Sequence, residues 1–211
     1  MSRKPRYDRE QALDNAVALF WQRGYHASSL KHLEQALDMR PGSLYATFGS
    51  KEALFQEALD RYAARMSESL EACLQASDSR LDGLRRYIRQ LARACEAAQN
   101  DSGVLTIPAC MLVKTLLEAN PQNDTLRVHA NRLLGETEAK FRVVLQEAQE
   151  RGELAPDADC QRLARLVQAQ IMGLRSFAQR ETDAGSVVAL AEDMLVLLDS
   201  RFDQTAVNAV H

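Results

Sequence analysis

The chain is poor in the residues that interrupt helices, with five prolines and nine glycines among 211 residues. Ala, Leu, Gln, Glu and Arg are abundant instead, and 46% of the residues are hydrophobic, which is enough for a sizeable core. This composition predicts an all-α fold, and the hydrophobic periodicity indicates about nine helices.

The sequence also lacks a membrane-spanning segment, because no run approaches 18 apolar residues. The basic start, MSRKPRYDRE, is not followed by the apolar stretch of a secretory signal. The four cysteines are widely scattered without a C-x-x-C pair, so we expect reduced thiols rather than a disulfide framework. These absences predict a cytoplasmic protein without membrane contact.

Signatures of catalysis and of metal binding are missing as well. The four histidines are dispersed, and no spacing of His, Cys or carboxylate residues matches a metal site. No Walker loop, G-x-G-x-x-G fingerprint or G-x-S-x-G nucleophile motif occurs. We therefore expect a protein that is not an enzyme and that carries no cofactor or metal.

The most informative segment is RGYHASSLKHLEQALDMRPGSLYATFGSK, from Arg23 to Lys51. Apolar residues at helical spacing predict a helix over residues 29–37, with Ser28 or Ser29 as its N-cap. Pro41 suits a first helical position and opens a second pattern that stops near Gly49. Two short helices separated by a tight turn are typical of a helix-turn-helix.

The second of these helices has a distinctive outer face. With Leu44 directed inward, Gly42 and Ala46 point outward, and Ser43 and Tyr45 flank them. A face of Gly and Ala lets a helix approach another body closely, and the major groove of DNA is such a body. On spacing alone, a helical hairpin used only for packing is an equal alternative. The competing class is a protein-interaction or ligand-binding module whose head does not bind DNA specifically.

Basic residues gather at the N-terminal tip, at Arg3, Lys4, Arg6 and Arg9, although the formal net charge of the whole chain is −3. Such an arm could follow a phosphate backbone or a minor groove. A disordered, solubilising tail explains residues 2–6 equally well.

The segment RGYHASSLKHLEQALDMRPGSLYATFGSKEALF resembles the DNA-binding segment of TetR-family repressors, and ALDNAVALFWQRGY resembles the first helix of that family. The resemblance covers roughly residues 8–60. It implies a three-helix head in which the third helix reads the operator and Lys51 binds a phosphate. The family usually begins its reading helix with Ser-Lys, whereas this chain has Arg40-Pro41, a change that affects the cap. The residues expected to contact DNA are Ser29, Lys31, Arg40, Pro41, Gly42, Ser43, Tyr45, Ala46 and Lys51.

The same resemblance divides the chain into a DNA-binding head, residues 1–50, and a helical regulatory and dimerisation domain, residues 51–211. It implies that the last two helices, predicted over residues 160–179 and 186–202, form a four-helix bundle with their copies in a second subunit. The final helix is apolar over more than one face, as such packing requires, although a wholly intramolecular core is the alternative. The expected dimerisation residues are Leu166, Ile171, Leu174, Leu190, Met194, Leu195 and Leu198.

A second informative stretch, PACMLVK, runs from Pro108 to Lys114. With Pro108 at the first helical position, Cys110 falls in the first turn and Lys114 lies one turn further along the same face. The helix dipole and the lysine would both favour a thiolate, so Cys110 and Lys114 form a candidate sensor. The stretch resembles the Gly-Cys-Leu-Leu-Val block of a TetR subgroup, some of whose members sense electrophiles or oxidants. A small buried side chain at a helix junction is the equal alternative.

Two clusters of charge carry no functional assignment. Arg85, Arg86, Arg89 and Arg93 are expected to form a solvated face without a partner, and the acids at 192 and 193 are expected to be ordinary surface charge. The TetR resemblance, taken with the helical pattern, implies a homodimeric one-component transcriptional regulator. We expect a repressor that is released from a palindromic operator by a small-molecule ligand or by modification of a reactive cysteine.

Overall fold

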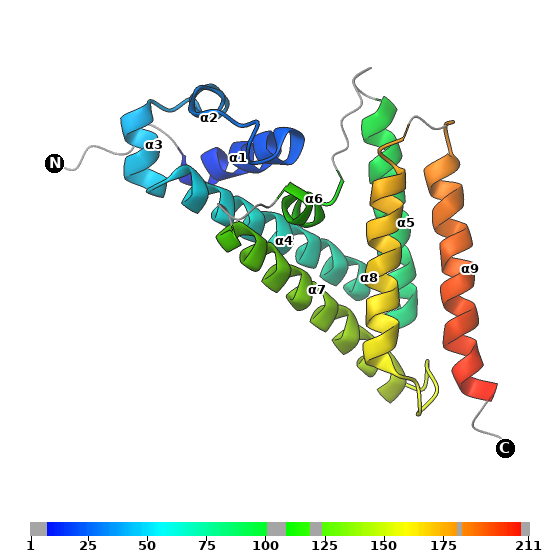
Figure 1. The fold of residues 1–211 in the computed structure, drawn as a ribbon. Helices are drawn as coiled ribbons and strands as arrows, with labels where there is room; N and C mark the ends of the chain where they lie inside the picture. Colours follow the sequence, from blue (N-terminus) through cyan, green and yellow to red (C-terminus); the bar gives the residue numbers. More distant parts are fainter. Residues whose placement is uncertain (1–7, 101–108, 119–123, 181–182, 208–211) are drawn as a thin grey trace. The chain divides into compact units, whose positions relative to one another are not determined.

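The computed structural model describes residues 8–100, 109–118, 124–180 and 183–207, and these residues form nine α-helices (Figure 1). The predicted all-α class is therefore confirmed. The basic arm predicted at residues 3–6 and the helix start predicted at Pro108 lie outside the described residues. Within the described ranges, no helix combines the length and the apolar character of a membrane span.

The helix bounds agree closely with the hydrophobic pattern. The helix predicted from Pro41 to near Gly49 is observed over Pro41–Phe48. The last two helices begin at residues 160 and 186 as predicted, but the first of them ends at Phe177 and the second at Val207. The elements are α1 (Arg9–Arg23), α2 (Leu30–Leu37), α3 (Pro41–Phe48), α4 (Lys51–Gln75), α5 (Arg80–Asn100), α6 (Met111–Glu118), α7 (Asp124–Glu150), α8 (Cys160–Phe177) and α9 (Ser186–Val207).

Contacts divide the chain into two compact units. The first contains Met1–Arg65 and Met111–Leu133, and the second contains Met66–Cys110 and Leu134–His211. Helices α4 and α7 each contribute residues to both units. The first unit thus adds α6 and the first parts of α4 and α7 to the three-helix head. The predicted functional division, with a DNA-binding head at residues 1–50 and a regulatory domain at residues 51–211, stays a prediction.

The first unit is built around α1. Asp8 caps this helix by accepting hydrogen bonds from the amides of Glu10 and Gln11. Phe20 is fully buried, and its ring meets that of Phe55 in α4 edge-on, with 4.8 Å between the ring centroids. The buried apolar residues of the three-helix head are Ala12, Leu13, Ala16, Val17, Phe20, Leu33, Leu37, Met39, Leu44 and Phe48. They follow the helical spacing that the sequence shows.

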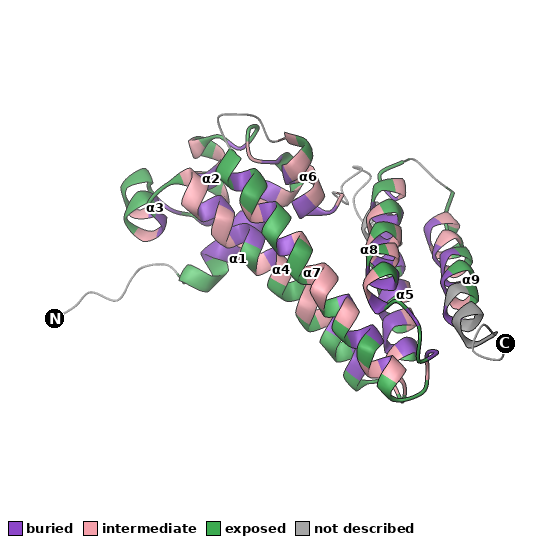
Figure 2. Cartoon of the chain, turned by 60° about the horizontal axis from the view of Figure 1, so that its bottom comes forward, coloured by how far each residue is buried: buried purple, intermediate pink, exposed green. Residues whose placement is uncertain are grey.

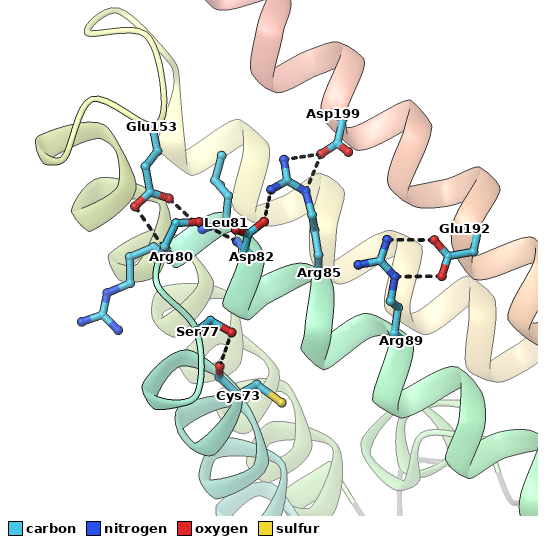
Figure 3. Close-up of polar contacts among 11 residues, drawn as sticks. Cys73, Ser77, Arg80, Leu81, Asp82, Arg85, Arg89, Glu153, Glu192 and Asp199 are labelled. Atoms are coloured by element: carbon cyan, nitrogen blue, oxygen red, sulfur yellow. Dashed lines mark hydrogen bonds and ion pairs between the residues drawn. The ribbon is translucent and has the colours of Figure 1, made fainter.

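In the second unit, α9 packs against both α5 and α8 (Figure 1). Two carboxylates cap helix starts in this unit. Glu153 accepts hydrogen bonds from the amides of Arg80 and Leu81 at 3.0 and 2.9 Å, at the start of α5 (Figure 3). Glu96 of α5 does the same for the first turn of α9. Acidic groups at helix N-termini also interact favourably with the helix dipole.

Ion pairs join α5 to α9 along their length (Figure 3). Arg85 donates to Asp199 from Nε and Nη2 at 3.0 and 2.9 Å and to Asp82 at 2.7 Å. Arg89 and Glu192 form a two-point pair at 2.8 and 2.9 Å, which holds the pKa of Glu192 below its usual range. For Arg85 and Arg89 the expectation of a solvated face without a partner is therefore wrong, and so is that of ordinary surface charge at Glu192. The partners of these two arginines lie about a hundred residues away in the sequence, where helical periodicity gives no information. Arg86 and Arg93 are exposed, as expected.

Candidate nucleic-acid interface

Helix α2 begins with a reciprocal capping box. The Ser29 hydroxyl oxygen accepts from the His32 amide at 3.3 Å, and His32 Nδ1 accepts from the Ser29 amide at 3.2 Å. Ser28 is buried instead and donates its hydroxyl to the carbonyl of Gly24 at 2.7 Å. The cap is thus Ser29, whose hydroxyl is engaged with its own helix. Lys31 is exposed in the first turn.

The turn between α2 and α3 is tight and lacks a side-chain cap. Asp38 adopts the left-handed conformation (φ 50°), which Asp tolerates better than most residues. Met39 is buried beneath the turn. Arg40 makes no capping hydrogen bond, but Pro41 at the first helical position has no amide proton to satisfy. The Arg40 side chain is exposed next to the start of α3.

Helix α3 has one buried and one exposed side. Leu44 and Phe48 fix it to the core with 0% and 4% exposure. On the other side, Gly42, Tyr45 and Ala46 are exposed, and Figure 2 shows little burial along this helix. The predicted orientation of the helix is therefore confirmed, whereas contact of these residues with DNA stays a prediction.

We define the α3 ridge as the four residues Gly42, Ser43, Tyr45 and Ala46. A Cβ atom on Gly42 would meet nothing within 4 Å, so the backbone is open there. Ser43 is half-buried, and its carbonyl accepts the Thr47 hydroxyl at 2.7 Å. Tyr45 is 44% exposed and is the largest side chain on the ridge. The ridge therefore exposes backbone that a partner can approach closely, next to the protruding phenol of Tyr45.

Lys51 places a positive charge at the first position of α4, close in sequence to the α3 ridge. The Ser50 hydroxyl oxygen accepts from the Ala53 amide at 3.0 Å and so caps this helix. The Lys51 ammonium lies over the ring of Tyr25, 4.3 Å from its centroid. Burial lowers the pKa of Lys51 from its ordinary value. A helix start that carries an ammonium group is a favourable place for a phosphate.

The ring beneath Lys51 is itself held in place. Tyr25 meets Phe55 edge-on with 5.1 Å between the ring centroids. Its backbone amide donates to Glu118 of α6 at 3.1 Å. Burial, together with the nearby charge of Glu52, raises the pKa of the Tyr25 phenol, which therefore stays neutral at physiological pH.

Helix α6 contacts the end of α1 through two charged side chains. Lys114 Nζ donates to the carbonyl of Gln22 at 3.0 Å and to that of Trp21 at 3.4 Å, which are terminal carbonyls of α1. Gly24 ends α1 with a positive φ of 79°, and a Cβ there would overlap the carboxylate of Glu118. We call these contacts the α6 clamp. Sequence reasoning missed Glu118, since a single glutamate in an amphipathic helix carries no distinctive signal.

Ala109 and Cys110 are not helical, and Cys110 directly precedes α6, which starts at Met111. The thiol is therefore not in the first turn, and it is buried, with 5% of the residue exposed. The described partners of the Lys114 ammonium are carbonyls of α1 and the Glu118 carboxylate, at 3.9 Å. A sensor role for Cys110 stays a prediction, but the local arrangement expected to activate it differs from the observed one.

All four cysteines are free and buried. That the thiols stay reduced is still a prediction. Burial raises the pKa of the thiols of Cys73, Cys95 and Cys160. Burial also raises the pKa of Tyr87 to about 12, an effect that Arg175 opposes and that Cys110 and Cys73 reinforce. The phenol of Tyr87 thus lies within electrostatic reach of two thiols inside the second unit.

The expected dimerisation residues are mostly interior. Residues buried in the core of the second unit are Ile171, Leu174, Met194, Leu195 and Leu198, and those partly buried against it are Leu166 and Leu190. The large apolar residues that α9 exposes are Val196 and Leu197, at 67% and 60%. Among the described side chains of α9, Val196 and Leu197 thus form an exposed apolar face in addition to the buried one. Dimerisation itself stays a prediction.

No cluster of His, Cys, Asp and Glu side chains within the described parts of the chain is suited to hold a metal ion. The polar features that remain are those of the first unit: the α3 ridge, Lys31 and Arg40 at the surface, and Lys51 at the start of α4. They combine a helix that can be approached closely with cations that suit a phosphate backbone.

This arrangement is that of a helix-turn-helix regulator, and comparison with known proteins identifies the family. Residues 12–58 match the family described as bacterial regulatory proteins, tetR family, and residues 83–192 match the tetracyclin repressor-like C-terminal domain. The chain belongs to the TetR family of DNA-binding transcriptional regulators. Because this family consists of regulators rather than enzymes, the choice between a DNA-binding regulator and a protein-interaction module is decided for the former.

The chain is similar along most of its length to several members. The HTH-type transcriptional repressor ComR of Escherichia coli (strain K12) is 30% identical over 195 residues, which cover 90% of this chain and 89% of ComR. A triple cysteine variant of the TetR family regulator CifR, complexed with 26bp double-strand operator DNA, is 30% identical; the match covers 92% of this chain and 98% of that one, with a TM-score of 0.80. A regulator from Chloroflexus aurantiacus is 24% identical over 93% of this chain and 94% of its own, with a TM-score of 0.74, and shares the fold.

Proposed function

We propose that this protein is a cytoplasmic, homodimeric repressor that binds a palindromic operator and leaves it when a small molecule binds or when a cysteine is modified. The observation that carries the DNA-binding part is the exposed α3 ridge with Lys51 close by. The names of the similar proteins support repression, since ComR is a repressor and CifR was captured on operator DNA.

In this proposal α3 enters the major groove. Gly42 and Ala46 lack long side chains, so the backbone of α3 can lie close to the base edges. Few direct hydrogen bonds to bases are then available. Contacts with thymine methyl groups, the Tyr45 phenol and the shape of the DNA carry the specificity. Arg40, Lys31 and Lys51 contact phosphates, and they set register and affinity rather than sequence preference.

A homodimer supplies two copies of α3, related by a two-fold axis. The half-sites of the operator are then about 34–36 Å apart, or a multiple of that distance, and form an approximate palindrome. The exposed residues Val196 and Leu197 of α9 support an interface at this helix.

Release requires an inducer that prefers the conformation with lower DNA affinity, because equal affinity for both conformations shifts nothing. An apolar ligand within the second unit or an electrophile at Cys110 would release DNA in this way if it bound or reacted only in that conformation.

The direct test measures binding of the protein to the promoter fragment upstream of its own gene. Fluorescence anisotropy reports the binding at a series of rising salt concentrations. Lys51→Ala should weaken binding to every duplex and reduce the slope of log K against log salt by about 0.9 for each bound subunit. A panel of electrophiles and apolar compounds added to the complex then separates the two modes of release. Binding with an unchanged salt slope in Lys51→Ala would exclude this phosphate contact.

A further inference from the structure

We infer that Tyr25 is a positioning residue that holds the Lys51 ammonium where a backbone phosphate of bound DNA meets it. This inference rests on the proposed phosphate contact of Lys51. It adds a residue that does not itself touch DNA and that links this contact to α6.

The geometry of the pair suits this role. The Lys51 ammonium lies 4.3 Å from the centroid of the Tyr25 ring, on its face. A cation over an aromatic face is attracted by the ring quadrupole, and this attraction uses none of its hydrogen bonds in the way that a carboxylate partner would. The ammonium carries three N–H donors. Donors on the side away from the ring therefore stay available for phosphate oxygens while the ring holds the side chain.

The ring can hold Lys51 because it is fixed from two sides. Its edge contact with Phe55, 5.1 Å between centroids, attaches it to α4, and Phe55 is itself in edge contact with Phe20 at 4.8 Å. The Tyr25 amide donates to Glu118 of α6 at 3.1 Å. A lysine on a fixed platform loses less side-chain freedom when a phosphate binds, and this raises affinity for any duplex. The same contacts give α6 a direct path to a DNA-binding side chain.

The alternative is that Tyr25 only fills space between α1 and α4. The two roles differ in one respect: a space-filling ring affects DNA binding independently of Lys51, whereas a positioning ring acts only through it. Paired substitutions at the two sites separate the roles, because coupled residues give effects that do not add.

The experiment measures anisotropy titrations of the promoter fragment and of a random 26-base-pair duplex with the full-length protein. The variants are Tyr25→Leu, Tyr25→Phe and Lys51→Ala, with each Tyr25 change repeated in the Lys51→Ala background. Tyr25→Leu should weaken binding of both duplexes by about three- to tenfold, and Tyr25→Phe, which keeps the ring, should bind like the parent. In the Lys51→Ala background Tyr25→Leu should have no further effect. In a Lys31→Ala background, the matched control at an exposed lysine, its effect should persist.

The outcomes separate the inference from the proposed function. If Lys51→Ala weakens binding but Tyr25→Leu costs the same factor with and without Lys51, the inference is wrong and the DNA-binding function stands. If Lys51→Ala has no effect on either duplex, the phosphate contact is wrong and the inference falls with it. A measurement that needs no substitution of Tyr25 covers the case in which Tyr25→Leu fails to fold. In the parent, NMR should place the ε-methylene protons of Lys51 upfield through the ring current, and ordinary lysine shifts would overturn the inference.

Discussion

At the scale of single residues, Tyr45 should separate sequence-specific from general binding. It protrudes from the α3 ridge with 44% exposure, whereas Leu44 beside it is fully buried. We expect Tyr45→Ala to lower affinity for the promoter fragment by about tenfold, the range of one good base contact, and to leave the random duplex almost unaffected. Parallel anisotropy titrations of both duplexes check this. An equal loss on both would make Tyr45 a backbone contact.

The thiols allow a second prediction at this scale. Burial raises the pKa of Cys73, Cys95 and Cys160, so that little thiolate is present at neutral pH. These three should alkylate slowly at pH 7 and faster as the pH rises, as mass-spectrometric labelling at graded pH will show. If Cys110 is the sensor, it should label first, and Cys110→Ser should keep DNA binding while losing the response to electrophiles. Labelling of Cys110 last would make the thiol structural and leave a reversible ligand as the inducer.

At the scale of the helices, the α6 clamp links α6 to the end of α1. Glu118→Ala leaves the Tyr25 amide without its described acceptor and should lower the free energy of unfolding by about 1–3 kcal/mol. Glu118→Gln keeps an acceptor oxygen of the same reach and should cost less, which makes it the matched control. Lys114→Met removes two donors to α1 carbonyls and should cost about 1 kcal/mol. Urea unfolding of the three variants gives the comparison, and equal stability of all of them would show that the clamp is unimportant.

The pairing of α5 with α9 predicts a dependence on pH. The Arg89 hydrogen bonds hold the pKa of Glu192 below its unfolded value, so the pair stabilises the fold above about pH 4.3. That contribution is lost as the pH falls through the lowered pKa. The pair is partly exposed, so Arg89→Met should cost less than about 1 kcal/mol at pH 7. The difference in unfolding free energy between Arg89→Met and the parent should disappear at acidic pH. Urea unfolding at neutral and at acidic pH measures it, and an equal difference at both would contradict the prediction.

The bounds of a helix were predictable where residues at its ends, such as Pro or Gly, mark its start or its end in the sequence. Pro41 and Gly49 mark the two ends of α3, which is observed with the predicted bounds. The exposed side of α3 followed from periodicity in the same way. The Arg89–Glu192 pair and the contact of Glu118 with Tyr25 join residues about a hundred positions apart, so no local pattern encodes them. Which residues of α9 meet a second subunit stays a prediction for a related reason, because periodicity shows that a face is apolar but not which neighbour covers it.

At the scale of the molecule, α9 offers adjacent residues that separate assembly from folding. Leu198 is 1% exposed, whereas Leu197 is 60% exposed. Leu198→Glu buries an unpaired charge and should unfold the second unit. Leu197→Glu should keep the helical circular dichroism of the parent and yield a monomer with weak operator binding. Light scattering after gel filtration reports the mass, and a folded Leu197→Glu dimer would place the subunit contact elsewhere.

The open backbone at Gly42 makes this protein easy to redirect to new promoters. Gly42 is the second residue of α3, where a side chain points to solvent and breaks no hydrogen bond, so most replacements there should leave the helix intact. A Cβ at this position meets nothing within 4 Å, and longer side chains gain room without repacking the core. Engineers of synthetic gene circuits could therefore randomise position 42 alone and recover folded variants at high frequency. Because a side chain at position 42 would hold the α3 backbone further from the base edges, those variants should bind the parent promoter less well and differ in which promoter they silence.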